Sequence, residues 1–182
     1  MNTANRHKSR NLRCPAVLAP VVFVVGLLAG CASLSVSHLE SRPFPAATTT
    51  TLAMKFWSFE FTGRVSGTTY AIRGRATPVT TDLPPWVDRL ETLTLTAYLR
   101  DGAGNVLASS ERNYKGLPLT EGAAVPFEFK LTPTGDVPVG CAVSFGYKAV
   151  FASGKARSAL GASGPPPAGS VFFVGEGAVL KH

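Results

Sequence analysis

Apolar and polar side chains alternate along much of the chain from residue 57 onward. Between Trp57 and Val65 the apolar side chains are separated by single Ser, Glu, Thr and Arg residues. A period of two places successive side chains on opposite faces of a strand, so this stretch predicts a strand with one buried face. The same pattern recurs in four further segments: 70–77, 92–99, 127–131 and 143–151.

Turn-forming residues separate these segments. Ser66-Gly67-Thr68 follows the first strand, Pro78 and Pro84-Pro85 bracket a connection, and Asp101–Asn105 predicts a hairpin turn with a returning strand at 106–110. Short apolar runs at 171–174 and 178–180 predict terminal strands after a Pro-rich loop at 162–170. No segment has a convincing helical period. Seven or eight short strands with frequent turns predict an all-β fold, an antiparallel β-sandwich of the Ig-like or transthyretin-like type.

Composition supports this fold class. Hydrophobic residues make up 45% and charged residues 16% of the chain, with 18 Gly and 14 Pro residues. These values exclude a disordered chain and a coiled coil, and 182 residues are too few for a multidomain enzyme. Residues 31–53 differ from the rest because they are rich in Ser, Thr, Ala and Pro. They predict a flexible tether that precedes a β-sandwich domain at 54–182.

The N-terminus has the three parts of a secretory signal. Four basic residues lie within the first 13, an apolar run follows from Pro15 to Leu28, and small residues end it at Ala29-Gly30. This order predicts a signal peptide over residues 1–30. The alternative is an uncleaved anchor, although the apolar run is shorter than the ~20 residues of a comfortable membrane span.

The end of this signal, Leu28-Ala29-Gly30-Cys31, resembles the lipobox of bacterial lipoproteins. The resemblance implies cleavage between Gly30 and Cys31 and attachment of a diacylglycerol to the Cys31 thiol, which makes the membrane a partner through that lipid. Ala32 stands where the enterobacterial inner-membrane retention signal would be Asp. The implied location is the outer membrane, with the domain facing the periplasm.

Cleavage changes the charge balance. The whole chain has a formal net charge of +7, but residues 1–30 contain four of its 18 Lys and Arg residues and none of its 11 acids. The mature chain therefore carries 14 basic against 11 acidic residues. This weak excess, together with export from the cytoplasm, excludes nucleic acid as a partner.

The His and Cys residues limit the catalytic chemistry. The three His residues lie in the signal, in the expected tether and at the C-terminus: His7, His38 and His182. A Ser-His-Asp or Cys-His arrangement and a His/Cys zinc site are therefore not expected in the domain. The remaining catalytic candidates are the carboxylates before the third strand, which are better explained as a solvated loop: Asp82, Asp88 and Glu91. We expect no enzyme activity, no cofactor and no metal.

The three Cys residues have separate roles. Cys14 leaves with the signal and Cys31 is the lipidation site, so Cys141 has no partner for an intramolecular disulfide. Cys141 has the same parity as Val143 and Phe145 on the clearest apolar face of the chain. It is expected to pack in the core as a small hydrophobic residue.

Four surface side chains are candidates for partner contact. Arg64, Arg73 and Arg75 fall on the solvent faces of adjacent strands, where Arg73 and Arg75 either meet a partner or form an ordinary charged surface. Trp86 follows Pro84-Pro85 at the start of the third strand. It either covers one end of the core or anchors a partner.

Several segments between Gly63 and Lys155 resemble the YbaY/YscW-type lipoproteins, small β-sandwiches that include type III secretion pilotins. The segments are Leu83–Pro85, Leu93–Asp101, Val106–Ala108, Val125–Leu131 and Tyr147–Lys155. The resemblance implies a periplasm-facing outer-membrane lipoprotein, and pilotins of this group bind a short segment of a secretin. The stretch between Ala76 and Leu83 is longer than in that group, and no binding residue is carried over.

Two functions from different classes remain. The first is a non-catalytic interaction or assembly factor that is tethered by lipid and binds an envelope partner such as a secretin. The alternative is a glycan- or lipid-binding module whose stacking surface includes Trp57, Trp86 or Tyr114.

Overall fold

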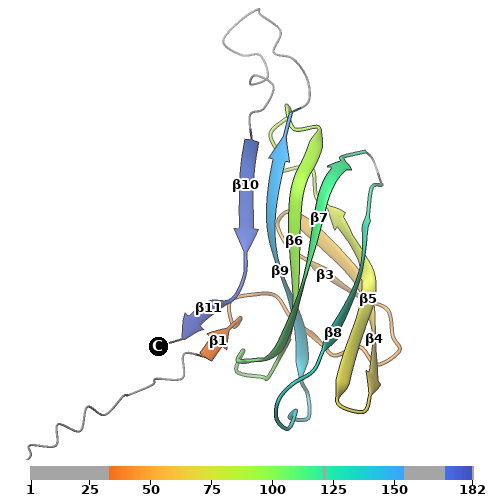
Figure 1. The fold of residues 1–182 in the computed structure, drawn as a ribbon, viewed down its shortest axis with the longest axis vertical. Helices are drawn as coiled ribbons and strands as arrows, with labels where there is room; N and C mark the ends of the chain where they lie inside the picture. Colours follow the sequence, from red (N-terminus) through yellow and green to blue (C-terminus); the bar gives the residue numbers. More distant parts are fainter. Residues whose placement is uncertain (1–32, 121, 154–170, 182) are drawn as a thin grey trace, which may run out of the picture. The chain divides into compact units, whose positions relative to one another are not determined.

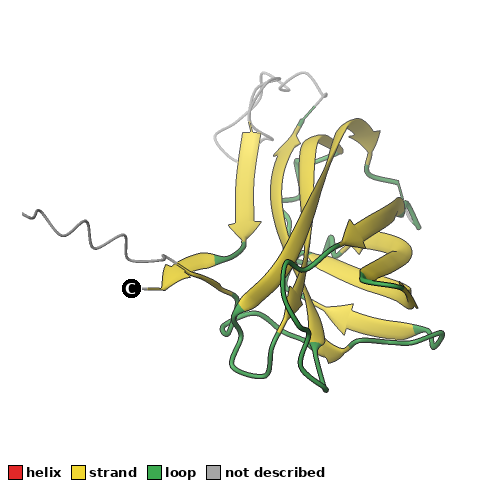
Figure 2. Cartoon of the chain, turned by 60° about the horizontal axis from the view of Figure 1, so that its bottom comes forward, coloured by secondary structure: helices red, strands yellow, loops and turns green. Residues whose placement is uncertain are grey.

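The computed structural model describes residues 33–120, 122–153 and 171–181, and its regular elements in these ranges are all strands (Figures 1 and 2). The strands are β1 (Ser33–Ser35), β2 (Arg42–Pro43), β3 (Thr50–Ala53), β4 (Trp57–Ser66), β5 (Thr69–Pro78), β6 (Arg89–Arg100), β7 (Val106–Pro118), β8 (Val125–Leu131), β9 (Ala142–Ala152), β10 (Val171–Glu176) and β11 (Val179–Lys181). Each of the eight expected strands has a counterpart from β4 onward. The additional strands β1, β2 and β3 lie in the expected tether.

The strands form two main sheets whose strand pairs are antiparallel. One sheet has the order β10-β9-β6-β7, with β2 also paired to β9, and the other has the order β3-β4-β5-β8. The inner faces of the two sheets meet in the core, where the rings of Phe59 on β4 and Phe145 on β9 stack with centroids 4.3 Å apart. A separate two-stranded ribbon pairs β1 with β11. The predicted all-β antiparallel sandwich is therefore confirmed.

Aromatic side chains fill the core at the positions that the alternation predicts. The ring of Phe145 lies among those of Phe59, Phe61 and Phe127, at centroid distances of 4.3, 5.0 and 5.4 Å. On β8 buried and exposed residues alternate without exception. Val65 departs from the prediction and is 47% exposed. It lies at the end of β4 beside the hairpin turn, where the core has ended.

Residues 33–53 do not form the expected free tether. They provide one strand to each of three sheets: β1 pairs with β11, β2 with β9 and β3 with β4. Val36 and Leu39 are buried against Tyr98, and Leu52 is buried in the main core. The composition of this segment resembles a linker, and its strands are too short to show a period. Its order comes from contacts with strands far away in the sequence.

The first part of this segment is held against the turn that joins β6 to β7. The Val36 amide donates to the Gly104 carbonyl at 2.8 Å, and Arg100 Nη1 donates to the Val36 carbonyl at 3.0 Å. Gly104 has a φ of +87°, and a Cβ at this position would lie 2.6 Å from Cα of Ser37. Glycine is therefore required at this turn both for its backbone conformation and for the close approach of residues 36–37.

The same turn confirms the hairpin expected at 101–105. Asp101 Oδ1 accepts hydrogen bonds from the amides of Ala103 and Asn105, both at 2.9 Å, and Oδ2 accepts one from Asn105 Nδ2 at 2.8 Å. These bonds favour the charged carboxylate, and the side-chain bond from Asn105 contributes most to lowering the pKa of Asp101. The returning strand β7 reaches Pro118, well beyond the expected end at residue 110.

The predicted signal peptide at 1–30 and the predicted loop at 162–170 lie outside the described residues. Within the described ranges, no helix is long and apolar enough to cross a membrane.

Candidate binding site

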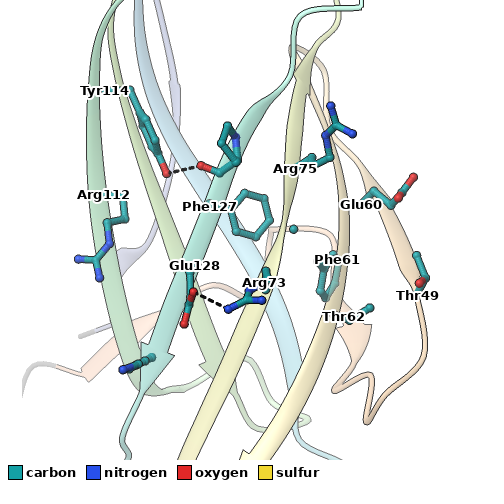
Figure 3. Close-up of a pocket in the computed structure, with 13 residues that line it drawn as sticks. Thr49, Glu60, Phe61, Thr62, Arg73, Arg75, Arg112, Tyr114, Phe127 and Glu128 are labelled. Atoms are coloured by element: carbon teal, nitrogen blue, oxygen red, sulfur yellow. Dashed lines mark hydrogen bonds and ion pairs between the residues drawn. The ribbon is translucent and has the colours of Figure 1, made fainter.

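An open groove of about 750 Å³ lies on the outer face of the four-stranded sheet and reaches across to β7 (Figure 3). It is bounded by β4, β5, β8 and β7 and by Thr49 just before β3. We call it the basic groove. The polar and charged side chains that line it are Thr49, Glu60, Thr62, Arg73, Arg75, Arg112, Tyr114, Glu128 and Lys130.

Strand register determines which side chains of the four-stranded sheet face the groove. Glu60 on β4 lies opposite Arg75 on β5. Thr62 lies opposite Arg73, which in turn lies opposite Glu128 on β8. These residues alternate with residues of the same strands that face the core. They therefore lie together on the outer face of the sheet.

Strand β7 supplies the other side of the groove. Arg112 and Tyr114 lie opposite Leu95 and Leu93 of β6, so they have the parity of the core face. Strands β7 and β8 are each the last strand of their sheet. Side chains on the core face of β7 therefore extend toward β8 at the edge of the sandwich instead of into the core. Tyr114 Oη donates to the Pro126 carbonyl on β8 at 3.1 Å, and this bond joins the two sheets.

The groove contains more cations than carboxylates. Four basic side chains line it, Arg73, Arg75, Arg112 and Lys130, against Glu60 and Glu128. The Arg73 guanidinium pairs with Glu128 at 3.0 Å, but the two side chains are 77% and 48% exposed. Within the described residues, the other three cations of the groove form no ion pair within 4.0 Å.

Tyr114 stays protonated beside these cations. Burial raises the pKa of its hydroxyl, and the charge of Arg112 opposes this shift with a smaller effect. At neutral pH Tyr114 is therefore neutral and uses its hydroxyl hydrogen in the bond to Pro126, and the Arg and Lys side chains give the groove a positive charge that suits an acidic ligand.

A second hollow of about 670 Å³ adjoins the basic groove and shares Thr62, Arg73 and Glu128 with it. It continues over the outer face of β4 and β5 as far as Arg64 and Ala46. The two hollows together form a trough over the outer face that runs from Tyr114 and Pro126 to Arg64 and Ala46.

The structure places the predicted surface residues in two separate regions. Arg64, Arg73 and Arg75 are exposed on the outer face of the four-stranded sheet, as expected, and Arg73 and Arg75 line the basic groove. Trp86 is half-buried in the connection between β5 and β6 and does not line the groove. The sequence pattern did not identify Arg112 and Lys130 as residues of a binding site. The short length expected for β7 hid the contribution of Arg112, although the alternation of β8 could have indicated Lys130.

Two of the aromatic residues expected to form a stacking surface are already engaged. Trp57 is fully buried, with its ring stacked on Phe151 at a centroid distance of 6.5 Å, so the expectation that it stacks on a ligand is wrong. The hydroxyl of Tyr114 bonds to β8. Of the three residues named for a stacking surface, only Trp57 is removed by burial, because Trp86 and Tyr114 are half-buried.

The remaining chemical candidates do not come together. Cys141 lies just before β9, where it is half-buried and packs against the main core as a small hydrophobic residue, and burial raises the pKa of its thiol. Asp82 is exposed, and Glu91 pairs with Arg89. Among the described residues, no group of three or more His, Cys, Asp or Glu side chains is arranged to hold a metal ion. Gly30 and Cys31 lie outside the described residues.

No protein-family model, curated protein or solved structure matches this chain.

Proposed function

We propose that this protein is a non-catalytic interaction factor of the bacterial envelope that binds an extended acidic segment of a partner in the basic groove. A lipid on Cys31 anchors it to the outer membrane, with the domain facing the periplasm. The proposed action is similar to that of a pilotin holding a short segment of a secretin. The observation that carries the proposal is the open groove with three cations that lack a carboxylate partner among the described residues.

The shape of the groove favours an extended polypeptide. Its floor is the outer face of β4, β5 and β8, and it continues into the adjoining hollow past Arg73. Strand β7, the last strand of the other sheet, runs along its side. A segment lying in this trough would pass several guanidinium groups in succession, and guanidinium binds carboxylates through paired hydrogen bonds.

The side chains of the groove are suited to binding rather than to catalysis. Its lining contains neither His nor Cys, and its Thr hydroxyls have no neighbouring side chain that could act as a base at neutral pH other than the two Glu residues. Glu128 is engaged with Arg73. Positive charge on an open surface also increases the rate at which an acidic partner associates, and added salt weakens this effect.

A photo-crosslinking experiment in cells tests the proposal. A photoreactive amino acid replaces Thr62 in the groove of the tagged full-length chain, and the crosslinked partner is identified by mass spectrometry after purification in mild detergent. We expect a single envelope protein, and we expect Arg75→Glu and Arg112→Glu to reduce its yield strongly because each reverses a groove charge.

Lys115→Glu is the matched control. Lys115 is exposed on β7 like Arg112, but it lies opposite Thr92 and therefore points to the other face of the sandwich. Equal loss of crosslinking in Lys115→Glu and Arg112→Glu would show that overall charge rather than the groove binds the partner. Absence of any partner crosslinked from Thr62 would refute the groove as the binding site.

A further inference from the structure

The exposed apolar side chains of the described chain gather on one part of the domain. Of the seven large hydrophobic residues that are exposed there, five belong to β1, β10 and β11. We call these five the apolar edge: Leu34, Val171, Phe173, Val179 and Leu180. Their exposed fractions range from 40% for Leu34 to 68% for Phe173. A gathering of this kind marks a contact surface, whereas single exposed apolar residues need no explanation.

The strand register pairs two of these residues and places Phe173 on the outer face. Leu34 lies directly opposite Leu180 in the ribbon of β1 and β11. Phe173 lies opposite Val150 of β9, which lies opposite Thr92 of β6, on the outer face of the five-stranded sheet. Strand β11 follows β10 after two residues, with β1 beside it (Figure 1).

The ribbon is attached to the same outer face. The Ala178 amide donates to Tyr98 Oη at 3.2 Å, and Tyr98 lies opposite Ser144 on the outer side of β6. Gly146 on the neighbouring strand allows this crossing, because a Cβ there would lie 2.9 Å from the Glu176 carbonyl. The ribbon therefore lies on the side of the sandwich that Val171 and Phe173 face, with Leu34 and Leu180 on one face of the ribbon and Val179 on its other face.

The position of the ribbon in the chain indicates what covers it. Strand β1 begins at Ser33, two residues after Cys31. Two residues span at most ~7 Å. With residues 33–53 packed against the domain, a lipid on Cys31 holds Leu34 and its neighbours close to the bilayer. This step rests on the lipid anchor in the function proposed above.

We infer that the apolar edge lies in the headgroup region of the membrane that holds the lipid on Cys31. Exposed lysines flank it: Lys181 follows Leu180, and Lys148 lies opposite Gly175 on the outer face. Such lysines lay their carbon chains along apolar surface and reach headgroup phosphates with their ammonium groups. The carboxylate of Glu176 points to the inner side instead, where it accepts a hydrogen bond from Tyr147 Oη at 2.8 Å.

This contact sets the orientation of the basic groove. Val171 and Phe173 lie on the outer face of the five-stranded sheet, and the ribbon with the other three residues is attached to that face, whereas the groove lies on the outer face of the opposite sheet. A domain that rests on the membrane by the apolar edge presents the groove away from the bilayer, where a partner can reach it.

Quenching of tryptophan emission by brominated lipid tests this inference. The full-length chain with Phe173→Trp is expressed in cells, purified from their membranes and reconstituted into phosphatidylethanolamine and phosphatidylglycerol vesicles, with and without bromine on the acyl chains. Signal from the two native Trp residues is measured on the unsubstituted protein and subtracted. Val65→Trp is the matched control, because Val65 is also exposed but lies on the β4–β5 hairpin of the other sheet.

We expect bromine to remove much of the emission from the indole introduced by Phe173→Trp, and its spectrum to shift to shorter wavelength in vesicles. The indole introduced by Val65→Trp is expected to show neither change. Adding Leu34→Glu and Leu180→Glu to Phe173→Trp is expected to abolish the quenching. Equal emission from Phe173→Trp in both kinds of vesicle would overturn the inference, as would a disulfide-trapped dimer formed through Phe173→Cys in vesicles.

Mass spectrometry of the same purified chain separates this inference from the proposed function. An acylated Cys31 without quenching refutes only the membrane contact of the apolar edge. A chain without acyl groups refutes the lipid anchor, and quenching of vesicle-bound Phe173→Trp would still support the apolar edge as a membrane contact.

Discussion

Replacing Leu39 by Ala tests whether residues 33–53 are part of the fold. The Leu39 side chain is 5% exposed and packs in a cluster with Val36 and Tyr98. The substitution removes three buried carbon atoms, and at about 0.8 kcal/mol for each the transfer term is about 2.4 kcal/mol. A residual cavity adds to this cost, although residues 33–53 lie near the surface and can partly collapse into the cavity. We expect the free energy of unfolding to fall by about 2–3 kcal/mol, a large share of the stability of a typical domain.

Urea unfolding of the full-length chain in mild detergent measures this change, with Trp57 as the fluorescent reporter because it is fully buried in the core. Leu34→Ala is the matched control in the same segment, since Leu34 is 40% exposed and its loss should cost less than about 0.5 kcal/mol. If Leu39→Ala changed stability no more than Leu34→Ala, residues 33–53 would behave as the free tether that their composition suggests. The conclusion that they pack on Tyr98 as part of the fold would then be refuted.

Three further predictions concern the turns, the buried tyrosine and the surface ion pair. Gly104→Ala should destabilise the protein by more than the about 1–2 kcal/mol of a left-handed Ala, because its Cβ would also lie 2.6 Å from Cα of Ser37. Gly67 has a φ of +57° and open space around it, so Gly67→Ala should show only the backbone cost. Thermal unfolding of both variants measures the difference. Burial, and then a hydrogen bond to a carboxylate, raise the pKa of Tyr147 far above its usual 10.0, so the folded state holds this proton more tightly than the unfolded chain. The stability from this shift is complete below about pH 10 and is lost as the pH rises above that value. Tyr147→Phe should therefore flatten the alkaline decline of the free energy of unfolding, measured in urea from pH 8 to 11, and an unchanged slope would contradict this assignment. A double-mutant cycle on Arg73 and Glu128 should give a coupling energy below about 1 kcal/mol, because their side chains are 77% and 48% exposed; a larger value would mean that the pair stabilises the fold and is not free to bind a partner.

The predictions about the main strands succeeded where the alternation was long and regular. In β8, Phe127, Phe129 and Leu131 face the core and the residues between them face solvent, because a one-residue shift would expose the whole apolar set. The hairpin at 101–105 was equally clear from local residues, since Asp101 and Gly104 meet conformational requirements within the turn itself. These features need little information from distant parts of the chain.

The groove was only partly predictable. Arg73 and Arg75 were identifiable as exposed charges on one strand, but the sequence does not show that β8 pairs with β5 and brings Glu128 beside Arg73. Arg112 has the parity of a core residue and reaches the groove because β7 ends its sheet. Strand order therefore decides which charges share a surface.

The burial of Trp57 and Trp86 was also not predictable from the sequence. Both are large aromatic residues beside turn-forming sequence, and both were candidates for a stacking surface. The packing of Phe151 and Tyr147 around Trp57 buries one, whereas the β5–β6 connection leaves the other half-buried and away from the groove. Burial of this kind depends on the opposite sheet.

The sequence by itself determined the fold class, the core faces of the long strands and the two main hairpin turns, because a period of two and glycine at positive φ are properties of neighbouring residues. It also contains the lipobox-like signal, which remains a prediction about Cys31. Only the tertiary structure decided that residues 33–53 cover Tyr98, close the core and pair with three sheets. Their strands have two to four residues each, too few for a local pattern, and their order comes from burying Val36, Leu39 and Leu52 against strands that the sequence places far away.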